Sequence, residues 1–232
     1  MKAMILAAGL GKRMRPLTDH VPKPLLKVGE KYLIEFHLEK LAAAGIRDVV
    51  INTHWLAQQI PACLGSGEKW GLRLHYSHEP ELLETAGGIV QALSMLSDDT
   101  EPEFLLVNGD VYSELDITRF VQEASKKKKR CEAYLALVDN PAHQLKGDFV
   151  LKLDGELTQD AELGERLTYA GIALFHRNFF KDIKPGPSLL GPKLHAAIES
   201  GCVAGDHIRD YWLDVGTPER LQALRARLGS EL

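Results

Sequence analysis

Residues 4–18 read MILAAGLGKRMRPLT, a short apolar run that passes directly into a loop of small residues, glycines and cations. The run has the length and composition of a buried strand. In the loop, Gly9 and Gly11 carry no Cβ, so backbone amides can approach an anion closely and form a phosphate-binding concavity. A Walker loop would need GxxxxGK[ST], and a dinucleotide loop would need a third glycine where Met14 stands. We therefore predict a strand followed by a phosphate loop of neither usual type.

A rigid lysine follows this loop in residues 21–26, VPKPLL. The proline after Lys23 favours an extended conformation of that lysine, and Pro22 stiffens the approach to it. The motif therefore predicts a positive charge that projects from a rigid, non-helical stretch.

Strand and helix patterns alternate through the first half of the chain. Apolar, partly β-branched runs bounded by turn residues lie at residues 3–7, 49–52, 72–77 and 104–107. Helical patterns lie between them at residues 33–44, 55–64 and 88–96. Strands that alternate with helices favour a parallel sheet covered on both faces.

The second half has a different pattern. Its strand-like runs at residues 133–138, 149–153 and 169–175 lie too close together for helical crossovers throughout, so we expect antiparallel or mixed additions to the sheet. Helices are predicted after Asp116, near residues 190–200, and after Thr217, an N-cap followed by proline. The predicted fold class is α/β: a Rossmann-like, three-layer α/β/α arrangement with a mixed, mainly parallel central sheet.

Composition supports one globular body and excludes a disordered or fibrous chain. The 232 residues are 45% hydrophobic, and 28 basic against 32 acidic side chains give a formal net charge of -4. This balance indicates no nucleic-acid partner, and the basic run at residues 126–130 is typical of a solvated helix end. No apolar stretch reaches the roughly 18 residues of a membrane span. A cytoplasmic protein with no membrane partner is therefore expected.

The three cysteines, Cys63, Cys131 and Cys202, are far apart in the sequence and have no CxxC spacing. Neither a disulfide framework nor a zinc site is indicated. We expect buried thiols.

The segment LAAGLGKRMRPLT, followed by PKPLL, resembles the signature of the sugar-1-phosphate nucleotidyltransferase family, which has LAGG or LAAG, then GxGxR, a PLT-like triplet and PKP. Ala8 and Lys12 stand where many members have Gly and Thr. Further segments follow in the family's order, so the resemblance spans nearly the whole chain. It implies transfer of a nucleotidyl group from a nucleoside triphosphate to a sugar 1-phosphate, with release of pyrophosphate.

The resemblance implies roles for the N-terminal motifs. Arg13 is expected to contact the leaving pyrophosphate, and Lys23 to carry charge shared by the α-phosphate and the sugar phosphate; both are the expected catalytic residues. The GG-containing segment at residues 84–88 resembles the loop that closes over the base. The full expected nucleotide-binding set is Leu6, Ala7, Ala8, Gly9, Gly11, Lys12, Arg13, Lys23, Thr85 and Gly88.

Two aspartates resemble the family's Mg²⁺ ligands. Asp110 follows the apolar strand at residues 104–107, at the carboxyl end where open α/β sheets bind ligands. Asp214 lies in WLDVGT, just before the last predicted helix. Mg²⁺ takes one or two protein carboxylates and fills its other positions with phosphate oxygens and water, which suits such a pair.

The resemblance also implies sugar contacts from Asn108, Gly147, Glu165 and Tyr169. Glu162 and Glu156 are alternatives to Glu165. If the sugar carries a carboxylate, nearby cations would favour it, and the candidates are Lys146, His143 and Arg166.

Among family members the chain looks most like short uridylyltransferases, which implies UTP as the nucleotide and N-acetylmuramate 1-phosphate as the sugar phosphate. A phosphocholine cytidylyltransferase or a hexose-1-phosphate guanylyl-, thymidylyl- or uridylyltransferase remains an alternative. An inactive nucleotide-sugar sensor would be expected to lose the lysine or a metal carboxylate, and Lys23, Asp110 and Asp214 are all present.

The expected organisation is a single domain over residues 1–232, with a nucleotide-binding part at residues 1–112 and a sugar-binding part at residues 113–232. No C-terminal hexapeptide β-helix is expected. The trimer that such a domain builds is therefore not expected either, and a monomer or dimer is.

Overall fold

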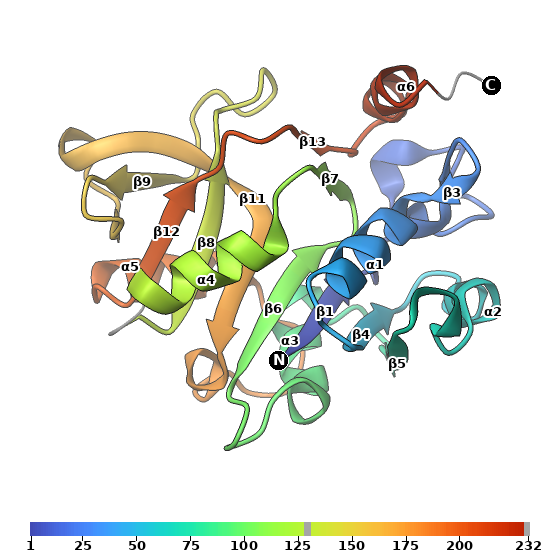
Figure 1. The fold of residues 1–232 in the computed structure, drawn as a ribbon, viewed down its shortest axis with the longest axis horizontal. Helices are drawn as coiled ribbons and strands as arrows, with labels where there is room; N and C mark the ends of the chain where they lie inside the picture. The colour runs from blue at the N-terminus through green and yellow to red at the C-terminus, as the bar shows by residue number, and fades with distance from the viewer. Residues whose placement is uncertain (128–130, 230–232) are drawn as a thin grey trace.

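A mixed sheet of nine strands forms the centre of the computed structural model, which describes residues 1–127 and 131–229 (Figure 1). The strand order is β10-β9-β11-β6-β1-β4-β5, and β8 joins β11 to β12. Four neighbouring strands are parallel: β6 (Glu103–Asn108), β1 (Lys2–Leu6), β4 (Asp48–Thr53) and β5 (Arg73–His78). These are the four strands predicted for the first half of the chain.

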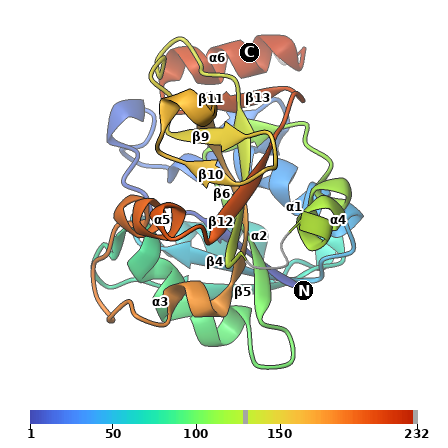
Figure 2. The ribbon, with the colours of Figure 1, turned by 90° about the vertical axis from the view of Figure 1, so that its left-hand side faces the viewer.

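Helices cover both faces of the sheet. Figure 2 shows α1 (Leu33–Ala43) and α4 (Ile117–Lys127) on one side, and α3 (Glu84–Leu96) and α5 (Leu190–Glu199) on the other. Side chains alternate along β1 accordingly: Ile5 packs in the core cluster that holds α1, and Met4 in the cluster that holds α3. The predicted three-layer α/β/α class is confirmed.

The antiparallel additions predicted for the second half are present. The long strand β11 (Gly164–His176) runs antiparallel to β6, and it also pairs with β8 (Ala133–Val138) and β9 (Phe149–Lys152). The short β10 (Leu157–Thr158) pairs with β9. Sequence periodicity missed β12 (Val203–His207), whose Gly, Asp and His lack a strand signal; it pairs parallel to β8.

Two small two-stranded sheets lie outside the main one. They are formed by β2 (Lys27–Val28) with β3 (Lys31–Tyr32), and by β7 (Val111–Ser113) with β13 (Trp212–Asp214). The last helix, α6 (Pro218–Arg227), begins as predicted, since the Thr217 hydroxyl accepts from the Arg220 amide. Its Leu221 packs with apolar residues of the N-terminal half. The parts expected on either side of residue 112 therefore share a core.

Two helix starts differ from their predictions. Helix α2 (Gln59–Leu64) begins four residues later than residue 55, and α3 begins four residues earlier than residue 88. Helix α3 already begins at Glu84, so Gly87 and Gly88 lie inside it. A Cβ on Gly87 would lie 2.3 Å from the Gly186 carbonyl oxygen, so glycine lets the first turn pack against that loop.

Two further expectations are wrong, and a third concerns residues that lie partly outside the described chain. Lys23 is not extended: it opens the 3₁₀ turn η2 (Lys23–Leu25), whose bonds run from the Leu25 and Leu26 amides and need none from Pro24. The expectation of buried thiols is wrong, because Cys63 is exposed on the solvent side of α2 and the other two cysteines are half-buried. The basic run at residues 126–130 extends beyond the described part of the chain, in which α4 ends at Lys127.

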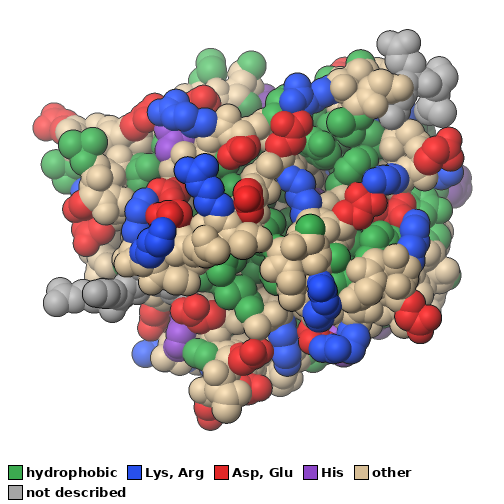
Figure 3. Space-filling model, in the orientation of Figure 1, with side chains coloured by type: hydrophobic (Ala, Val, Ile, Leu, Met, Phe, Trp, Pro, Cys, Tyr) green, Lys and Arg blue, Asp and Glu red, His purple; other side chains and the backbone are tan. Residues whose placement is uncertain are grey.

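On the face shown in Figure 3, acidic side chains lie between the lysines and arginines, and no continuous basic surface is visible there. In the described residues, no helix has both the length and the apolar character needed to cross a membrane.

Candidate active site

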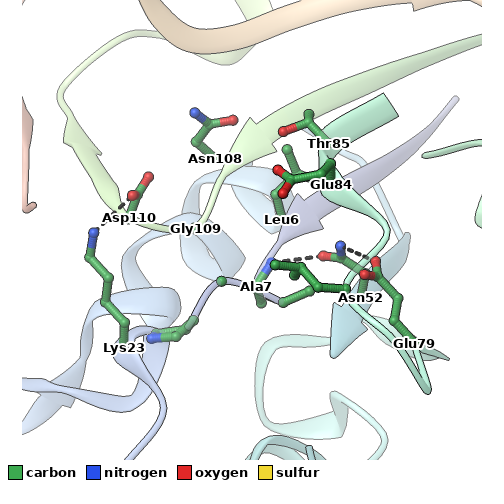
Figure 4. A pocket seen from close by; sticks show the side chains of 14 residues that line it. Leu6, Ala7, Lys23, Asn52, Glu79, Glu84, Thr85, Asn108, Gly109 and Asp110 are labelled. Carbon is green, nitrogen blue, oxygen red and sulfur yellow. Dashed lines mark hydrogen bonds and ion pairs between the residues drawn. The ribbon is translucent and has the colours of Figure 1, made fainter. Parts of the chain in front are cut away.

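A cavity of about 230 Å³ opens at the carboxyl ends of β1, β4 and β6 (Figure 4). This is where parallel α/β sheets place their ligands, because each strand there ends in a loop. The lining residues are Leu6, Ala7, Ala8, Gly9, Lys23, Pro24, Asn52, Glu79, Leu82, Glu84, Thr85, Asn108, Gly109 and Asp110. Most of the predicted nucleotide-binding residues therefore meet in one place, which we call the first cavity.

Lys23 crosses this cavity to Asp110. Its Nζ lies 2.8 Å from Asp110 Oδ2, and the lysine is only 8% exposed (Figure 4). The 3₁₀ turn holds the lysine backbone, while Asp110 lies two residues after the end of β6. Partial burial strengthens such a pair relative to one on the surface.

A buried polar chain supports the other side of the first cavity. The Ala7 amide donates to Asn52 Oδ1 at 2.7 Å, and Asn52 Nδ2 donates to Glu79 Oε1 at 2.7 Å (Figure 4). Glu79 Oε2 accepts from the Leu83 amide at 3.1 Å. The chain joins the ends of β1 and β4 to the loop before α3. Sequence reasoning missed Asn52 and Glu79, although each polar residue closes an apolar strand pattern.

Gly88 lies behind this polar chain and does not line the first cavity. A Cβ on Gly88 would stand 2.5 Å from Glu79 Oε1 and 3.0 Å from Asn52 Nδ2. Glycine is therefore needed here so that α3 can pack against the buried carboxylate.

Only some residues of the predicted phosphate loop line a cavity. Gly9 lines the first cavity, with open space where a Cβ would stand. Gly11 adopts φ 60°, and its carbonyl accepts from the Thr18 hydroxyl at 2.8 Å. Gly11 and Lys12 line neither this cavity nor its neighbour, whereas Arg13 lines the neighbour.

The neighbouring second cavity, of about 420 Å³, shares Asn108 and Asp110 with the first. Its full lining is Arg13, Asn108, Asp110, Val111, His143, Gln144, Thr168, Tyr169, Gly171, Trp212 and Asp214. The predicted sugar contacts Asn108 and Tyr169 meet here. The two cavities adjoin at the residues that end β6.

Pairing of β7 with β13 brings the two predicted metal-binding aspartates together. Asp214 is the register partner of Val111, and the Val215 amide donates to the Asp110 carbonyl at 2.8 Å. Each aspartate uses Oδ2 on a cation, Lys23 for Asp110 and Arg220 for Asp214. Two neighbouring carboxylates are the hard oxygen donors that suit a divalent cation such as Mg²⁺.

Glycine and the loop before β9 shape the second cavity. Gly171 adopts φ 73°, and a Cβ there would lie 2.7 Å from Asn108 Nδ2. Across the cavity, Asp148 accepts from Gln144 Nε2 and from the Tyr169 amide. These bonds hold the loop that carries His143 against β11.

The sequence matches the family model for nucleotidyl transferases over residues 2–159. The chain belongs to the nucleotidyl transferase family. It is 44% identical over 232 residues to N-acetylmuramate alpha-1-phosphate uridylyltransferase of Neisseria meningitidis, covering 99% of both chains. It is 33% identical to the protein of that name from Caulobacter vibrioides, covering 97% of this chain and 96% of the relative.

Solved structures show the same fold. A candidate glucose-1-phosphate thymidylyltransferase from Bacillus anthracis superposes with a TM-score of 0.82 at 24% identity, covering 100% of this chain and 96% of the other. HddC from Yersinia pseudotuberculosis, complexed with GMP-PN, gives a TM-score of 0.79 at 21% identity and covers 98% and 99%. The family resemblance and the fold expected from the sequence are both confirmed.

In this nucleotidyltransferase, Glu165 lies away from the second cavity. It stands four residues before Tyr169 on β11, which is about 13 Å of strand. Its Oε2 lies 3.4 Å from His207 Nδ1, and Asp139 lies 2.8 Å from His207 Nε2. The possible ligand atoms of Asp139, Glu165 and His207 lie within 4.8 Å of one another. Because each ring nitrogen of His207 already faces a carboxylate, we interpret these residues as an ion-pair cluster.

The structure also shows which of the other residues considered for sugar binding line a cavity. Gly147, at φ 59°, lines neither cavity and packs against Asn140. The two alternatives to Glu165 do not line either cavity: Glu156 pairs with Lys152, and Glu162 is exposed. Of the three cations considered for a carboxylate, only His143 lines the second cavity.

Burial sets the protonation of two groups near these cavities. The Tyr169 hydroxyl is buried with no hydrogen-bond partner in the described structure, and desolvation raises the pKa of Tyr169 above its usual range. His37, on α1 beneath β7, is buried, and desolvation lowers its pKa to about 4. A neutral His37 therefore lies under the strand that follows Asp110.

Proposed function

We propose that this protein transfers a uridylyl group from UTP to N-acetylmuramate α-1-phosphate, giving UDP-N-acetylmuramate and pyrophosphate. The observation that carries the proposal is the 44% identity over 99% of both chains to a uridylyltransferase of that name. Two adjoining cavities, which share Asn108 and Asp110, suit two phosphorylated substrates that must meet. The reaction would serve reuse of cell-wall sugars in the cytoplasm.

The chemistry requires positioning and charge neutralisation. An oxygen of the sugar phosphate attacks the α-phosphorus of UTP in line; a new O–P bond forms, and the bond to the departing pyrophosphate breaks. Residues of the first cavity would hold the nucleotide, with backbone amides near Gly9 facing the phosphates. No covalent enzyme intermediate is needed.

Lys23 and Arg13 would neutralise the charge that develops. Lys23 already lies at the junction of the cavities, 2.8 Å from Asp110, where an α-phosphate and a sugar phosphate would meet. Arg13 lines the second cavity. Fixed cations aimed at developing charge lower the barrier most, because they need no reorganisation during the reaction.

Asp110 and Asp214 would hold Mg²⁺. When bound, the ion would draw charge from the phosphate oxygens as a Lewis acid. The same two side chains would keep their places through the β7–β13 pairing before any ligand arrives. Oxygen ligands from two strands fit the expected Mg²⁺ chemistry.

A substrate panel tests the proposed function. Pyrophosphate release would be measured with Mg²⁺ for UTP, CTP, GTP and dTTP, each paired with N-acetylmuramate 1-phosphate, N-acetylglucosamine 1-phosphate, glucose 1-phosphate, mannose 1-phosphate and phosphocholine. We expect selective turnover of UTP with N-acetylmuramate 1-phosphate. Preference for CTP with phosphocholine, or for a hexose 1-phosphate, would reject this substrate pair, and no turnover across the panel would favour the inactive sensor.

A further inference from the structure

Arg220 makes a close contact with the second metal-binding aspartate. Its guanidinium NH1 donates to Asp214 Oδ2 at 2.7 Å, and the arginine and aspartate side chains are only 16% and 21% exposed. Arg220 lies in the first turn of α6, six residues after Asp214. Arg220 belongs to none of the sequence motifs that predict the site.

Gly216 provides the space for this contact. A Cβ on Gly216 would lie 2.4 Å from Arg220 NH2 and 2.8 Å from Asp214 Oδ1. The guanidinium therefore folds back over the turn between β13 and α6, and it does so only because residue 216 has no side chain.

His143 holds the same guanidinium from the other side. Arg220 NH1 lies 2.6 Å from His143 Nε2, and because arginine can only donate, this ring nitrogen accepts. The contact anchors Arg220 without cancelling its charge. Arg220 thus connects Asp214 to the loop that lines the second cavity.

The arrangement repeats the one at the first aspartate. Lys23 Nζ lies 2.8 Å from Asp110 Oδ2, just as Arg220 lies against Asp214 Oδ2. Two negative charges are therefore matched by two positive charges within hydrogen-bonding distance. In the described residues, the Oδ1 atoms of both aspartates make no hydrogen bond and remain available as ligands.

We propose that Arg220 is a resident counter-ion of Asp214 that keeps the affinity of the two aspartates for a free divalent cation low. A free divalent ion would meet a pair of carboxylates whose charge is already balanced, and the nearby cations would repel it. A metal–triphosphate complex carries net negative charge, which Lys23, Arg13 and Arg220 would attract. The inference rests on the proposed metal site at Asp110 and Asp214.

The test measures binding of free Mn²⁺ by electron paramagnetic resonance, with no nucleotide or sugar present. Arg220→Gln removes the charge and keeps a hydrogen-bond donor. We expect it to bind free Mn²⁺ on the order of tenfold more tightly than the wild type, because one repelling charge close to the ion is gone. Arg220→Lys keeps the positive charge and should bind free Mn²⁺ as weakly as the wild type. Asp214→Asn combined with Arg220→Gln should lose the higher Mn²⁺ affinity of the single Arg220→Gln variant.

A matched control lies on the same helix. Arg225 donates to the Lys27 carbonyl, so Arg225→Gln disturbs the docking of α6 without touching Asp214. It should leave Mn²⁺ affinity unchanged.

Unchanged or weaker Mn²⁺ binding in Arg220→Gln would overturn the counter-ion role. So would an equal gain in Arg225→Gln, which would assign the effect to helix docking. The titration contains no substrate, and its outcome is therefore separate from the substrate panel: a different nucleotide or sugar preference would reject the proposed substrates and leave the Mn²⁺ result standing.

Discussion

The two cavities are assembled in different ways. Around the first, Asn52 lies near the end of β4 and Asp110 lies two residues after β6, and a buried polar chain from the Ala7 amide through Asn52 to Glu79 supports the strand ends. Around the second, Asp214 and His143 arrive from segments far along the chain and are joined through Arg220, which pairs with Asp214 and donates to His143. The first cavity is therefore a product of the sheet itself, and the second depends on how later segments pack onto it.

This difference predicts how substitutions around each cavity affect stability and ligand binding. Damage to the polar chain that supports the first cavity should lower both stability and nucleotide binding, because that chain is buried. Damage to the second should alter sugar or metal binding with smaller changes in stability, because its ion pair is partly accessible to solvent, which weakens its contribution to folding.

Lys23→Ala should have the largest effect, because Lys23 lies where the cavities meet. We expect kcat to fall by about 10²–10³-fold or more, as when a fixed charge-stabilising group is lost. The melting temperature should change little, since Asp110 can then turn to water. Pyrophosphate release and thermal unfolding measure the two quantities. Lys31→Ala is the control, because Lys31 pairs with Glu39 at the surface and lines neither cavity; a near-native rate in Lys23→Ala would reject the assignment.

Acid should lower the free energy of unfolding through His37, which is buried on α1. Its folded pKa is about 4 against 6.5 for the free side chain, so between these values the unfolded chain binds a proton that the folded chain does not. The free energy of unfolding should therefore fall as pH drops from 6.5 towards 4, by up to about 3 kcal/mol.

Denaturant unfolding of the wild type and His37→Leu from pH 7 to pH 4 measures this contribution. The variant lacks the titrating group, so its stability should fall less steeply with acid. Parallel curves for the two proteins would show that another group is responsible.

Glu79→Ala should destabilise the support of the first cavity. It leaves Asn52 Nδ2 and the Leu83 amide without their partner, which costs about 1–3 kcal/mol of unfolding free energy. The KM for the nucleotide should rise. Glu165→Ala is the matched control at an exposed ion pair, where about 0.5 kcal/mol or less is expected. Equal losses in the two variants would contradict the contrast between the cavities.

Tyr169→Phe should have the smallest effect. It removes a buried hydroxyl that has no partner among the described residues, so stability should stay the same or rise by up to about 1 kcal/mol. The KM for the sugar phosphate should be unchanged, because the hydroxyl is hidden. Tyr169→Ala removes the ring from the second cavity and should raise that KM while leaving the KM for UTP unchanged; steady-state kinetics with each substrate distinguishes the two variants.

Local patterns predicted the first cavity well, with two omissions. Lys23, Gly9 and Asp110 each belong to a motif within a few residues of a strand, and the structure brings all three to the same cavity. Asn52 and Glu79 were missed because a single polar residue at or just after the end of a strand has no further signature. The conformation of Lys23 was wrong, since the hydrogen bonds of a 3₁₀ turn do not require the amide that Pro24 lacks.

The second cavity was predicted only in part. Tyr169 and Asp214 line it, but Glu165 does not, because a difference of four positions along an extended strand moves a side chain by about 13 Å. Arg220 had no local signature at all. Its role follows from the fold of one turn around Gly216 and from the approach of His143 from a distant loop.

The sequence by itself determined the alternation of buried strands and helices, the phosphate loop with its neighbouring lysine, and the family to which the chain belongs. These features depend on residues close together in the chain, where side-chain period and backbone freedom act directly. The tertiary structure alone decided that β13 pairs with β7 and that Arg220 lies on Asp214. Such contacts join segments whose separation along the chain carries no local pattern, so only packing of the whole core can select them.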